Sequence, residues 1–216
     1  MAPVKVKICG ITNLEDALAA IDAGADLLGL NFYPKSPRFI SELVALKIRA
    51  KVPKKVTSVG VFVNASGAEV LACVQSVRLD AAQLHGDESA ETVKEIARVV
   101  PVIKAFRVEP EFPLRHLNGF PDVFAFLFDA PHSGDYGGTG RVSGWNLARR
   151  AAATHRIFLA GGLNPENVAE AVRTVRPYAV DVASGVESRP GMKDHALLRE
   201  FIRAAHSSDT ETSQVS

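Results

Sequence analysis

Cysteine is scarce in this sequence of 216 residues, with only Cys9 and Cys73. Two cysteines form neither a disulfide framework nor the paired spacing of a zinc site. We therefore expect reduced thiols in a reducing compartment. The sequence also offers no metal-ligand cluster of other residue types and no nucleotide-binding loop, so neither a metal nor another cofactor is expected.

Long apolar runs and an excess of one charge are also missing. No run approaches the roughly 18 residues that a membrane span needs, and residues 1–7 lack the apolar stretch of a signal peptide. Lys and Arg number 25 against 24 Asp and Glu. This balance gives no reason to expect nucleic acid or an anionic membrane as a partner. We expect a soluble, cytoplasmic protein.

Short apolar runs alternate with longer segments of helical period. An apolar content of 47% over this length fits one large domain. The expected strands are Val4–Cys9, Leu27–Phe32, Thr57–Val63, Ala81–Leu84, Val102–Arg107, Val123–Asp129, Ile157–Ala160 and Ala179–Val182. The expected helices are Asn13–Ala23, Ser41–Lys51, Ser66–Val77, Ser89–Val99, Pro113–Leu117, Gly144–Ala153, Pro165–Val175 and His195–Ala205. This alternation predicts a parallel sheet with helices outside it.

The number of units favours a closed sheet over an open, doubly wound one. The dinucleotide fingerprint GxGxxG is absent after the first strand, where Cys9-Gly10-Ile11-Thr12 stands instead. Eight units predict a single (β/α)₈ TIM barrel over residues 1–206, with short loops because such barrels usually need about 250 residues. Residues 207–216 are polar and lack apolar periodicity, which predicts a disordered C-terminal tail.

In such a barrel the active site lies at the C-terminal ends of the strands. Alternation along the first strand places Lys7 and Cys9 on the face opposite Val6 and Ile8, so we expect Cys9 inside the barrel mouth. A lone cysteine is more often an inert buried side chain. Its position at a strand end and the nearby cation of Lys7 favour an accessible thiolate instead.

A carboxylate ends the sixth strand. Asp129 follows an apolar run, so we expect burial to desolvate it and to favour a proton donor. The alternative is a helix cap or a loop ion pair. Strands one and six lie across a barrel from each other, so Cys9 and Asp129 could act on a substrate from two sides.

Glycines mark a candidate anion site and a candidate lid. Gly161 and Gly162 follow the seventh strand, and Ser184 and Gly185 follow the eighth, where barrels commonly bind phosphate through backbone N–H groups. Residues 135–141 contain Gly138 and predict a flexible flap, although a plain surface turn fits as well. Two further residues are candidates for contacts with a substrate, Arg38 for its carboxylate and His85 without a defined role.

Five segments together resemble phosphoribosylanthranilate isomerase. They are Lys7-Ile8-Cys9-Gly10-Ile11-Thr12, Gln83-Leu84-His85-Gly86, Tyr136-Gly137-Gly138-Thr139-Gly140, Ala160-Gly161-Gly162-Leu163-Asn164-Pro165 and Asp181-Val182-Ala183-Ser184-Gly185-Val186-Glu187. They occur in the order of that family and span nearly the whole chain. One departure is Arg141-Val142-Ser143-Gly144-Trp145, where many relatives carry a lysine and a Phe-Asp-Trp-like stretch.

The resemblance implies a step of tryptophan biosynthesis that needs no cofactor. N-(5-phosphoribosyl)anthranilate would become 1-(2-carboxyphenylamino)-1-deoxyribulose 5-phosphate by an Amadori rearrangement. By similarity, Asp129 is the general acid that protonates the ribose ring oxygen, and Cys9 is the general base that removes the C2′ proton. Arg38 would bind the anthranilate carboxylate. Main-chain groups around Gly162, Ser184 and Gly185 would hold the phosphate.

Three other functions remain open at this stage. A different sugar-phosphate isomerase or epimerase would depend on paired carboxylates, whereas the first strand here ends in cysteine. A phosphate-binding barrel without activity would not need Cys9 and Asp129. A cysteine-nucleophile hydrolase would need a histidine beside Cys9, and His85 is the only candidate at a strand end. The sequence does not decide between a monomer and a homodimer.

One prediction goes beyond the resemblance. In a closed barrel the eighth strand lies beside the first, so Asp181 should face inward next to Lys7. We expect an interior ion pair beneath Cys9.

Overall fold

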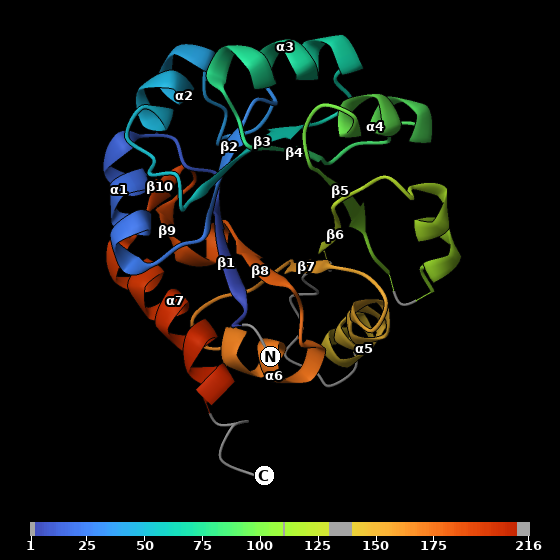
Figure 1. Ribbon diagram of the computed structural model, residues 1–216. Coiled ribbons are helices and arrows are strands. Elements are labelled where there is room, and N and C mark those ends of the chain that lie inside the picture. Colours follow the sequence, from blue (N-terminus) through green and yellow to red (C-terminus); the bar gives the residue numbers. More distant parts are fainter. Residues whose placement is uncertain (1–2, 110, 130–139, 211–216) are drawn as a thin grey trace.

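The protein is described from a computed structural model, which covers residues 3–109, 111–129 and 140–210, without the side chains of 140–143 and 208–210. Eight parallel strands close into one barrel in the order of the sequence (Figure 1). The strands are β1 (Lys5–Cys9), β2 (Leu27–Asn31), β3 (Thr57–Phe62), β4 (Ala81–Leu84), β5 (Val102–Arg107), β6 (Ala125–Asp129), β7 (Ile157–Ala160) and β8 (Ala179–Val182). The predicted barrel is confirmed.

Helices surround the barrel, one after nearly every strand. They are α1 (Leu14–Ala23), α2 (Glu42–Arg49), α3 (Gly67–Val77), α4 (Ala90–Ala97), η1 (Leu114–Gly119), α5 (Gly140–Ala152), α6 (Val168–Val175), η2 (Ser184–Val186) and α7 (His195–Thr210). A hairpin of β9 (Glu187–Arg189) and β10 (Met192–Lys193) follows η2. None of the described helices combines the length and the apolar character of a membrane span.

Local chemistry explains where the helices begin and end. The Asn13 side chain caps α1 by accepting a hydrogen bond from the Asp16 N–H, and Gly24 ends that helix with a φ of 102°. The unit after β5 is a 3-10 helix, because Pro113 and neighbouring prolines leave no room for a full α-helix.

The structure moves three predicted helix boundaries by three residues or more. Helix α6 starts at Val168 rather than Pro165, because the Asn164 side chain accepts from two backbone N–H groups and holds a turn there. Helix α5 starts at Gly140 rather than Gly144, so the end of the predicted flap is already helical. Helix α7 runs to Thr210, so residues 207–210 of the predicted disordered tail are helical, and residues 211–216 lie outside the described residues.

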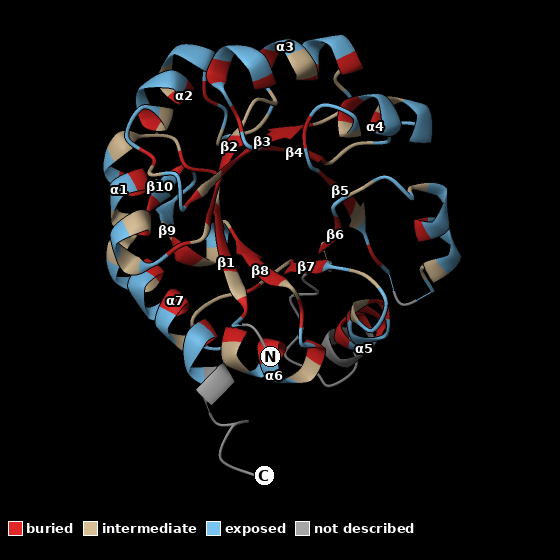
Figure 2. Cartoon of the chain, viewed as in Figure 1, coloured by how far each residue is buried: buried red, intermediate tan, exposed pale blue. Residues whose placement is uncertain are grey.

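The buried apolar side chains form two layers. One cluster fills the barrel interior with side chains from alternate strand positions, among them Leu27, Val59, Ile103, Leu127 and Phe158. The larger cluster lies between the strands and the helices. Figure 2 shows the strands almost entirely buried and the outer helix faces exposed. The interior is therefore a packed core, and only its C-terminal mouth is free for chemistry.

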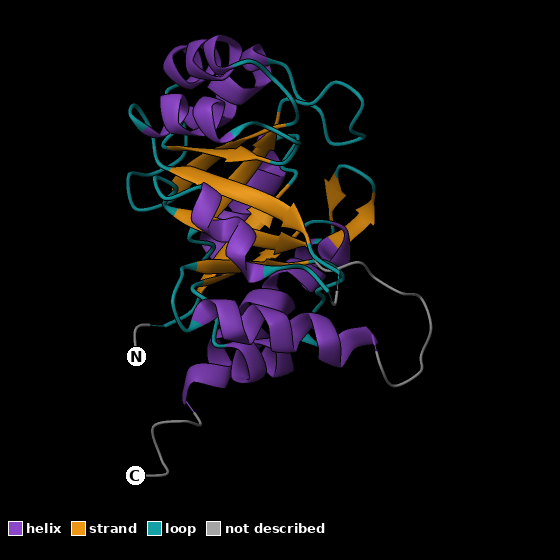
Figure 3. Cartoon of the chain, turned by 90° about the vertical axis from the view of Figure 1, so that its right-hand side faces the viewer, coloured by secondary structure: helices purple, strands orange, loops and turns teal. Residues whose placement is uncertain are grey.

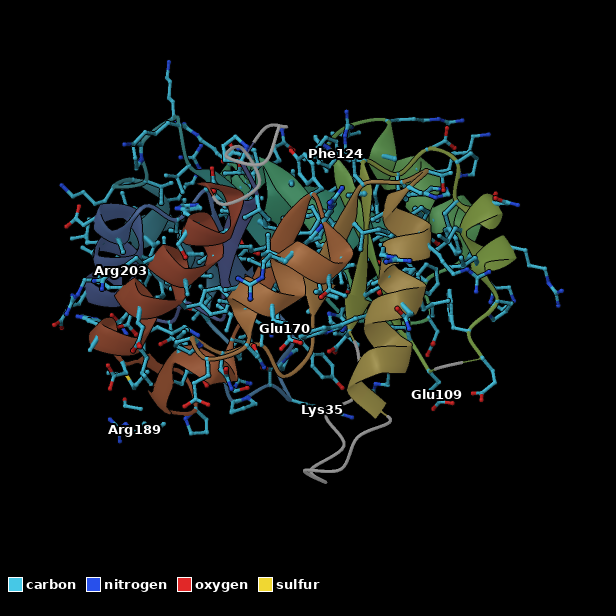
Figure 4. All side chains as sticks on the ribbon, turned by 90° about the horizontal axis from the view of Figure 1, so that it is seen from below. Lys35, Glu109, Phe124, Glu170, Arg189 and Arg203 are labelled. Carbon is cyan, nitrogen blue, oxygen red and sulfur yellow. The ribbon has the colours of Figure 1, made fainter. Side chains whose placement is uncertain are left out.

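The side view shows all barrel strands pointing toward one end of the molecule, where the β9–β10 hairpin lies (Figure 3). Three labelled residues that follow barrel strands mark this end in Figure 4: Lys35 after β2, Glu109 after β5 and Arg189 in the hairpin after β8. Phe124, which precedes β6, lies at the opposite end. The loops that follow the strands thus gather around one mouth.

Candidate active site

Cys9 ends β1 above a buried ion pair. Lys7 lies two residues earlier on the same face, and its Nζ is 2.7 Å from Oδ1 of Asp181 on β8. The Lys7 side chain has no exposed surface. The predicted interior pair of Lys7 and Asp181 is confirmed.

A glycine on the neighbouring strand makes room for this cluster. Gly29 on β2 lies in register with Cys9. A methyl group at Gly29 would come within 2.8 Å of the Cys9 Sγ and 3.1 Å of the Lys7 Nζ. The absence of a side chain at Gly29 therefore lets the thiol and the ammonium group share one corner of the barrel.

The charge state of Cys9 differs from the sequence-based prediction. Burial raises the pKa of the Cys9 thiol above its ordinary value of 9.0, and the Asp181 carboxylate raises it further. Lys7 and Lys193 lower the pKa of the thiol but do not offset the burial. The prediction of a ready thiolate is wrong for the free protein, because the sequence showed the lysine but not the depth of the site.

Lys7 itself is held in its charged form. Burial lowers the pKa of Lys7, but the Asp181 carboxylate and Cys9 more than offset it, so the net pKa lies above 10.5. A permanent positive charge therefore lies beside the Cys9 sulfur.

Asp129 ends β6, across the ring of strands from β1. Its Oδ2 is 3.5 Å from Nε2 of His85, which follows β4. The Asp129 side chain is 34% exposed, so the desolvation expected from its apolar strand is not present. The alternation that buries Phe128 turns the carboxylate into the open mouth.

The sequence left His85 without a role, and the structure gives it two partners. Besides Asp129, its Nδ1 is 2.9 Å from Nε2 of Gln83. Gln83 was not predicted as a site residue. It lies two positions before His85 and faces the barrel interior, and residues two apart on a strand share a face, so this spacing could have indicated it.

The loops after β7 and β8 contact each other at the predicted anion site. Gly161 and Gly162 have positive φ angles of 89° and 64°. A methyl group at Gly185 would overlap the Leu163 carbonyl oxygen, so only glycine lets the loops approach this closely. The N–H groups of Gly162 and Gly185 donate no hydrogen bond within the described part of the chain. Ser184 is exposed beside them and begins η2.

Arg38 lies against the hairpin that follows β8. Its Nε and Nη2 donate to the two carboxylate oxygens of Glu187 at 2.8 and 2.6 Å. A methyl group at Gly10 would collide with the Arg38 side chain, which places Arg38 over the turn after Cys9. The hydrogen bonds with Glu187 raise the pKa of Arg38.

A buried lysine joins this pair to β1. The Lys193 Nζ donates to the Cys9 carbonyl at 2.7 Å, to the Ala183 carbonyl at 3.0 Å and to Glu187 at 3.0 Å. Burial raises the pKa of Glu187, but Arg38 and Lys193 more than offset it, so the net pKa is lowered. Lys193 was not predicted as a site residue and Glu187 had no predicted role, because their bonds to Cys9 and Arg38 join positions 184 and 149 residues apart.

Gly138 lies outside the described residues, so its contact with a substrate stays a prediction, as does the flap at 135–139. Among the residues that the structure does describe, no group of three His, Cys, Asp or Glu side chains is placed to hold a metal ion.

Comparison with known proteins agrees with this arrangement. Residues 6–204 match the family described as N-(5'-phosphoribosyl)anthranilate isomerase. The protein of that name from Geobacter sulfurreducens is 51% identical, over 94% of this chain and 98% of its own length.

Solved structures of the same name superimpose on the barrel. The isomerase from Thermotoga maritima is 45% identical with a TM-score of 0.86, over 94% of this chain and 99% of that one. A second structure, 43% identical with a TM-score of 0.85 and the same coverage, holds reduced 1-(o-carboxyphenylamino)-1-deoxyribulose 5-phosphate. The Thermotoga maritima enzyme is also described as dimeric. The present chain belongs to the N-(5'-phosphoribosyl)anthranilate isomerase family, the isomerases that carry out this step of tryptophan biosynthesis.

Proposed function

We propose that Asp129 and Cys9 are the acid and the base of this isomerisation. The observation that carries the proposal is their placement, on β6 and β1 at opposite sides of one barrel mouth. The rearrangement of a ribosylamine to a ketose needs one proton added at the ring oxygen and one removed from C2′. Two groups facing each other across the opening ring meet that need.

The first step opens the ring. Asp129 donates a proton to the ribose ring oxygen while the bond between C1′ and that oxygen breaks. The electron pair of the aniline nitrogen then forms a C1′=N⁺ double bond, which leaves an iminium cation.

The second step removes the C2′ proton. The Cys9 thiolate takes this proton, and the C–H electrons form the C1′=C2′ bond of an enolamine, which tautomerises to the ketone. Because burial raises the pKa of the free thiol, the base must be generated in the complex. Two positive charges favour the thiolate there, the permanent one on Lys7 and the one that develops on the iminium nitrogen.

The two ends of the substrate would bind on either side of Cys9. The phosphate lies against the backbone of Gly161, Gly162, Ser184 and Gly185, where unused N–H groups and the close loops favour an anion. The anthranilate carboxylate pairs with Arg38. Glu187 already occupies Nε and Nη2, so the remaining Nη1 donates to the substrate while Glu187 fixes the guanidinium plane.

We also propose that the substrate is the phosphorylated small molecule named by the family and that the enzyme acts in the cytoplasm.

The dimeric relative supports a homodimer over a monomer. Sedimentation of the purified chain at several concentrations measures this directly.

The proposed roles are tested by forming phosphoribosylanthranilate in situ and following the loss of its fluorescence. The comparison uses the wild type, Cys9→Ser and Asp129→Asn. We expect both variants to lose about 10²–10⁴-fold in rate, the usual contribution of a general acid or base. Equal rates for all three proteins would contradict the proposal.

A further inference from the structure

The side chains of Gln83, His85 and Asp129 form a line that ends at the proposed acid. The Gln83 Nε2 is 2.9 Å from the His85 Nδ1, and the His85 Nε2 is 3.5 Å from the Asp129 Oδ2. Gln83 is only 1% exposed, whereas the His85 side chain is 30% exposed. The line therefore runs from the closed interior to the open mouth.

Asp129 needs a source for the proton that it donates. An aspartic acid side chain in water has a pKa of about 3.9, so near neutral pH it holds a proton only in special surroundings. Deep burial would be one such setting, but Asp129 is one-third exposed. An imidazolium in contact with the carboxylate can instead supply a proton during the reaction, because a histidine side chain in water titrates near 6.5.

The Gln83 amide suits both protonation states of His85. With its nitrogen facing Nδ1, the amide donates to a neutral ring whose proton is on Nε2. Rotated by 180°, the amide presents its oxygen at the same place and accepts from an imidazolium. The Gln83 Oε1 is buried and has no hydrogen-bond partner in the described part of the chain, so no other contact opposes this rotation.

The charged groups near His85 come from the loop after β4, from β5 and from η1. A cleft of about 690 Å³ opens beside it at the ends of β4 and β5. The titratable residues that line this cleft with His85 are Asp87, Glu88, Lys104, Arg107 and His116.

Two of these charges balance each other. Glu88 and Lys104 neutralise each other at 2.9 Å. Arg107 lies on β5 in register with Asp129 and has no ion-pair partner in the described residues. The Asp129 carboxylate is in direct contact with the His85 ring, at 3.5 Å.

We propose that His85 supplies the proton that Asp129 passes to the substrate, and that Gln83 positions His85 for this transfer. The Nε2 proton of His85 moves to Oδ2 of the Asp129 carboxylate, and the resulting carboxylic acid donates a proton to the ring oxygen as the C1′–O bond breaks, which returns Asp129 to the carboxylate. His85 is left neutral, with its remaining proton on Nδ1 donated to the Gln83 oxygen. Between turnovers solvent returns a proton to the partly exposed His85, and Cys9 releases the one taken from C2′.

His85→Gln is the principal test, with kcat and KM measured across pH on the substrate formed in situ. His116→Gln is the matched control, because His116 lines the same cleft from η1 without a contact to Asp129. We expect the wild type and the control to lose kcat as the pH rises through the histidine range. His85→Gln should lose about 10²-fold in kcat at pH 7 with an unchanged KM. Its kcat should not show the fall with rising pH that the wild type shows, and added imidazole should restore part of the rate.

Other outcomes would overturn the role of His85. One is a His85→Gln profile that equals the wild type, and another is a loss uniform over pH without imidazole rescue, which a merely structural histidine would give.

Gln83→Glu keeps the inference testable if His85→Gln does not fold. A carboxylate beside Nδ1 favours the imidazolium, so the alkaline limb of kcat should move to higher pH. An alkaline limb of kcat that does not move would overturn the inference.

The inference rests on the proposed acid role of Asp129, and the two can fail separately. Asp129→Asn at the wild-type rate would refute the acid role, whereas a normal His85→Gln profile in an enzyme that needs Asp129 would refute only the supply by His85.

Discussion

At the residue scale, the site depends on which side chains alternation turns inward. Sequence periodicity was enough to place Lys7 and Cys9 inside the mouth and to pair Lys7 with Asp181. It could not give the charge state of Cys9, because the pKa is the net effect of burial, of the nearby Lys7 and of two charges from distant parts of the chain, Asp181 and Lys193. It also could not show that His85 contacts Asp129, because the ends of β4 and β6 come together only when the barrel closes.

Gly29→Ala should damage catalysis more than folding. The added methyl group would come within 3.0 Å of the Cys9 Cα, which is backbone and cannot swing away. Displacing the base by about 1 Å costs roughly 10²-fold in rate, whereas overpacking costs about 1–3 kcal/mol of stability.

Gly60→Ala is the matched control for Gly29→Ala. Gly60 lies on β3, and its added methyl group would meet the side chains of Leu79 and Phe62 on the outer side of the barrel. It should lower the melting temperature without lowering kcat. Equal losses of kcat in both variants would contradict the role given to Gly29.

Substitutions of the buried pair should move the pKa of Cys9 in opposite directions. Asp181→Asn removes a charge that raises this pKa, and Lys7→Met removes one that lowers it. The rate of iodoacetamide alkylation against pH measures the shift. Burial raises the pKa of the Cys73 thiol to about 12, so Cys73 contributes little signal. Shifts of the same sign would contradict the arrangement.

Asp181→Asn should also destabilise the fold by about 3–5 kcal/mol, because it leaves Lys7 buried without its partner. The pKa of Lys7 is raised on folding, so the pair stabilises fully below the ordinary lysine pKa of 10.5 and is lost only above it. The loss should therefore be the same at pH 6 and pH 8. Unchanged melting temperature and an unchanged pH–rate profile together would refute the role of this pair.

At the element scale, the β9–β10 hairpin connects loops that follow different strands of the barrel. It carries Glu187 and Lys193 back across the mouth, where they hold Arg38 and the Cys9 carbonyl. Thr12 also donates from its side chain to the Gly191 carbonyl in the hairpin turn. The hairpin therefore links the loops after β1, β2 and β8 into one unit.

Local pattern could not reveal this hairpin. Its strands have only three and two residues, too few for a periodic signal. The bond between Arg38 and Glu187 joins positions 149 residues apart. Helix caps such as Asn13 were predictable, because a cap needs only the next few residues.

Glu187→Gln should change how stability responds to acid. The pKa of Glu187 is lowered in the folded protein, so its contribution is complete above the ordinary value of 4.5 and is lost as the pH falls through the folded value. The variant should be less stable than the wild type at pH 7, and this difference should shrink toward pH 3. Urea unfolding at a series of pH values measures it. A gap that widens in acid would contradict the assignment.

At the scale of the whole molecule, the closed barrel was predictable and its mouth only partly so. Eight alternating units leave few other topologies, because parallel strands need crossover helices and right-handed connections. The same rule placed the candidate residues at one end. Which of them contact each other depends on strand register and on loops that cross the mouth, such as Gly185 against Leu163.

The most direct test of the central claim is a single turnover with substrate deuterated at C2′. If Cys9 removes that hydrogen after Asp129 opens the ring, the wild type should slow on deuteration. Cys9→Ser should be far slower and still sensitive to deuterium, whereas Asp129→Asn should be slow and insensitive, because ring opening then limits the rate. A Cys9→Ser enzyme that turns over at the wild-type rate with an undiminished deuterium effect would contradict the account.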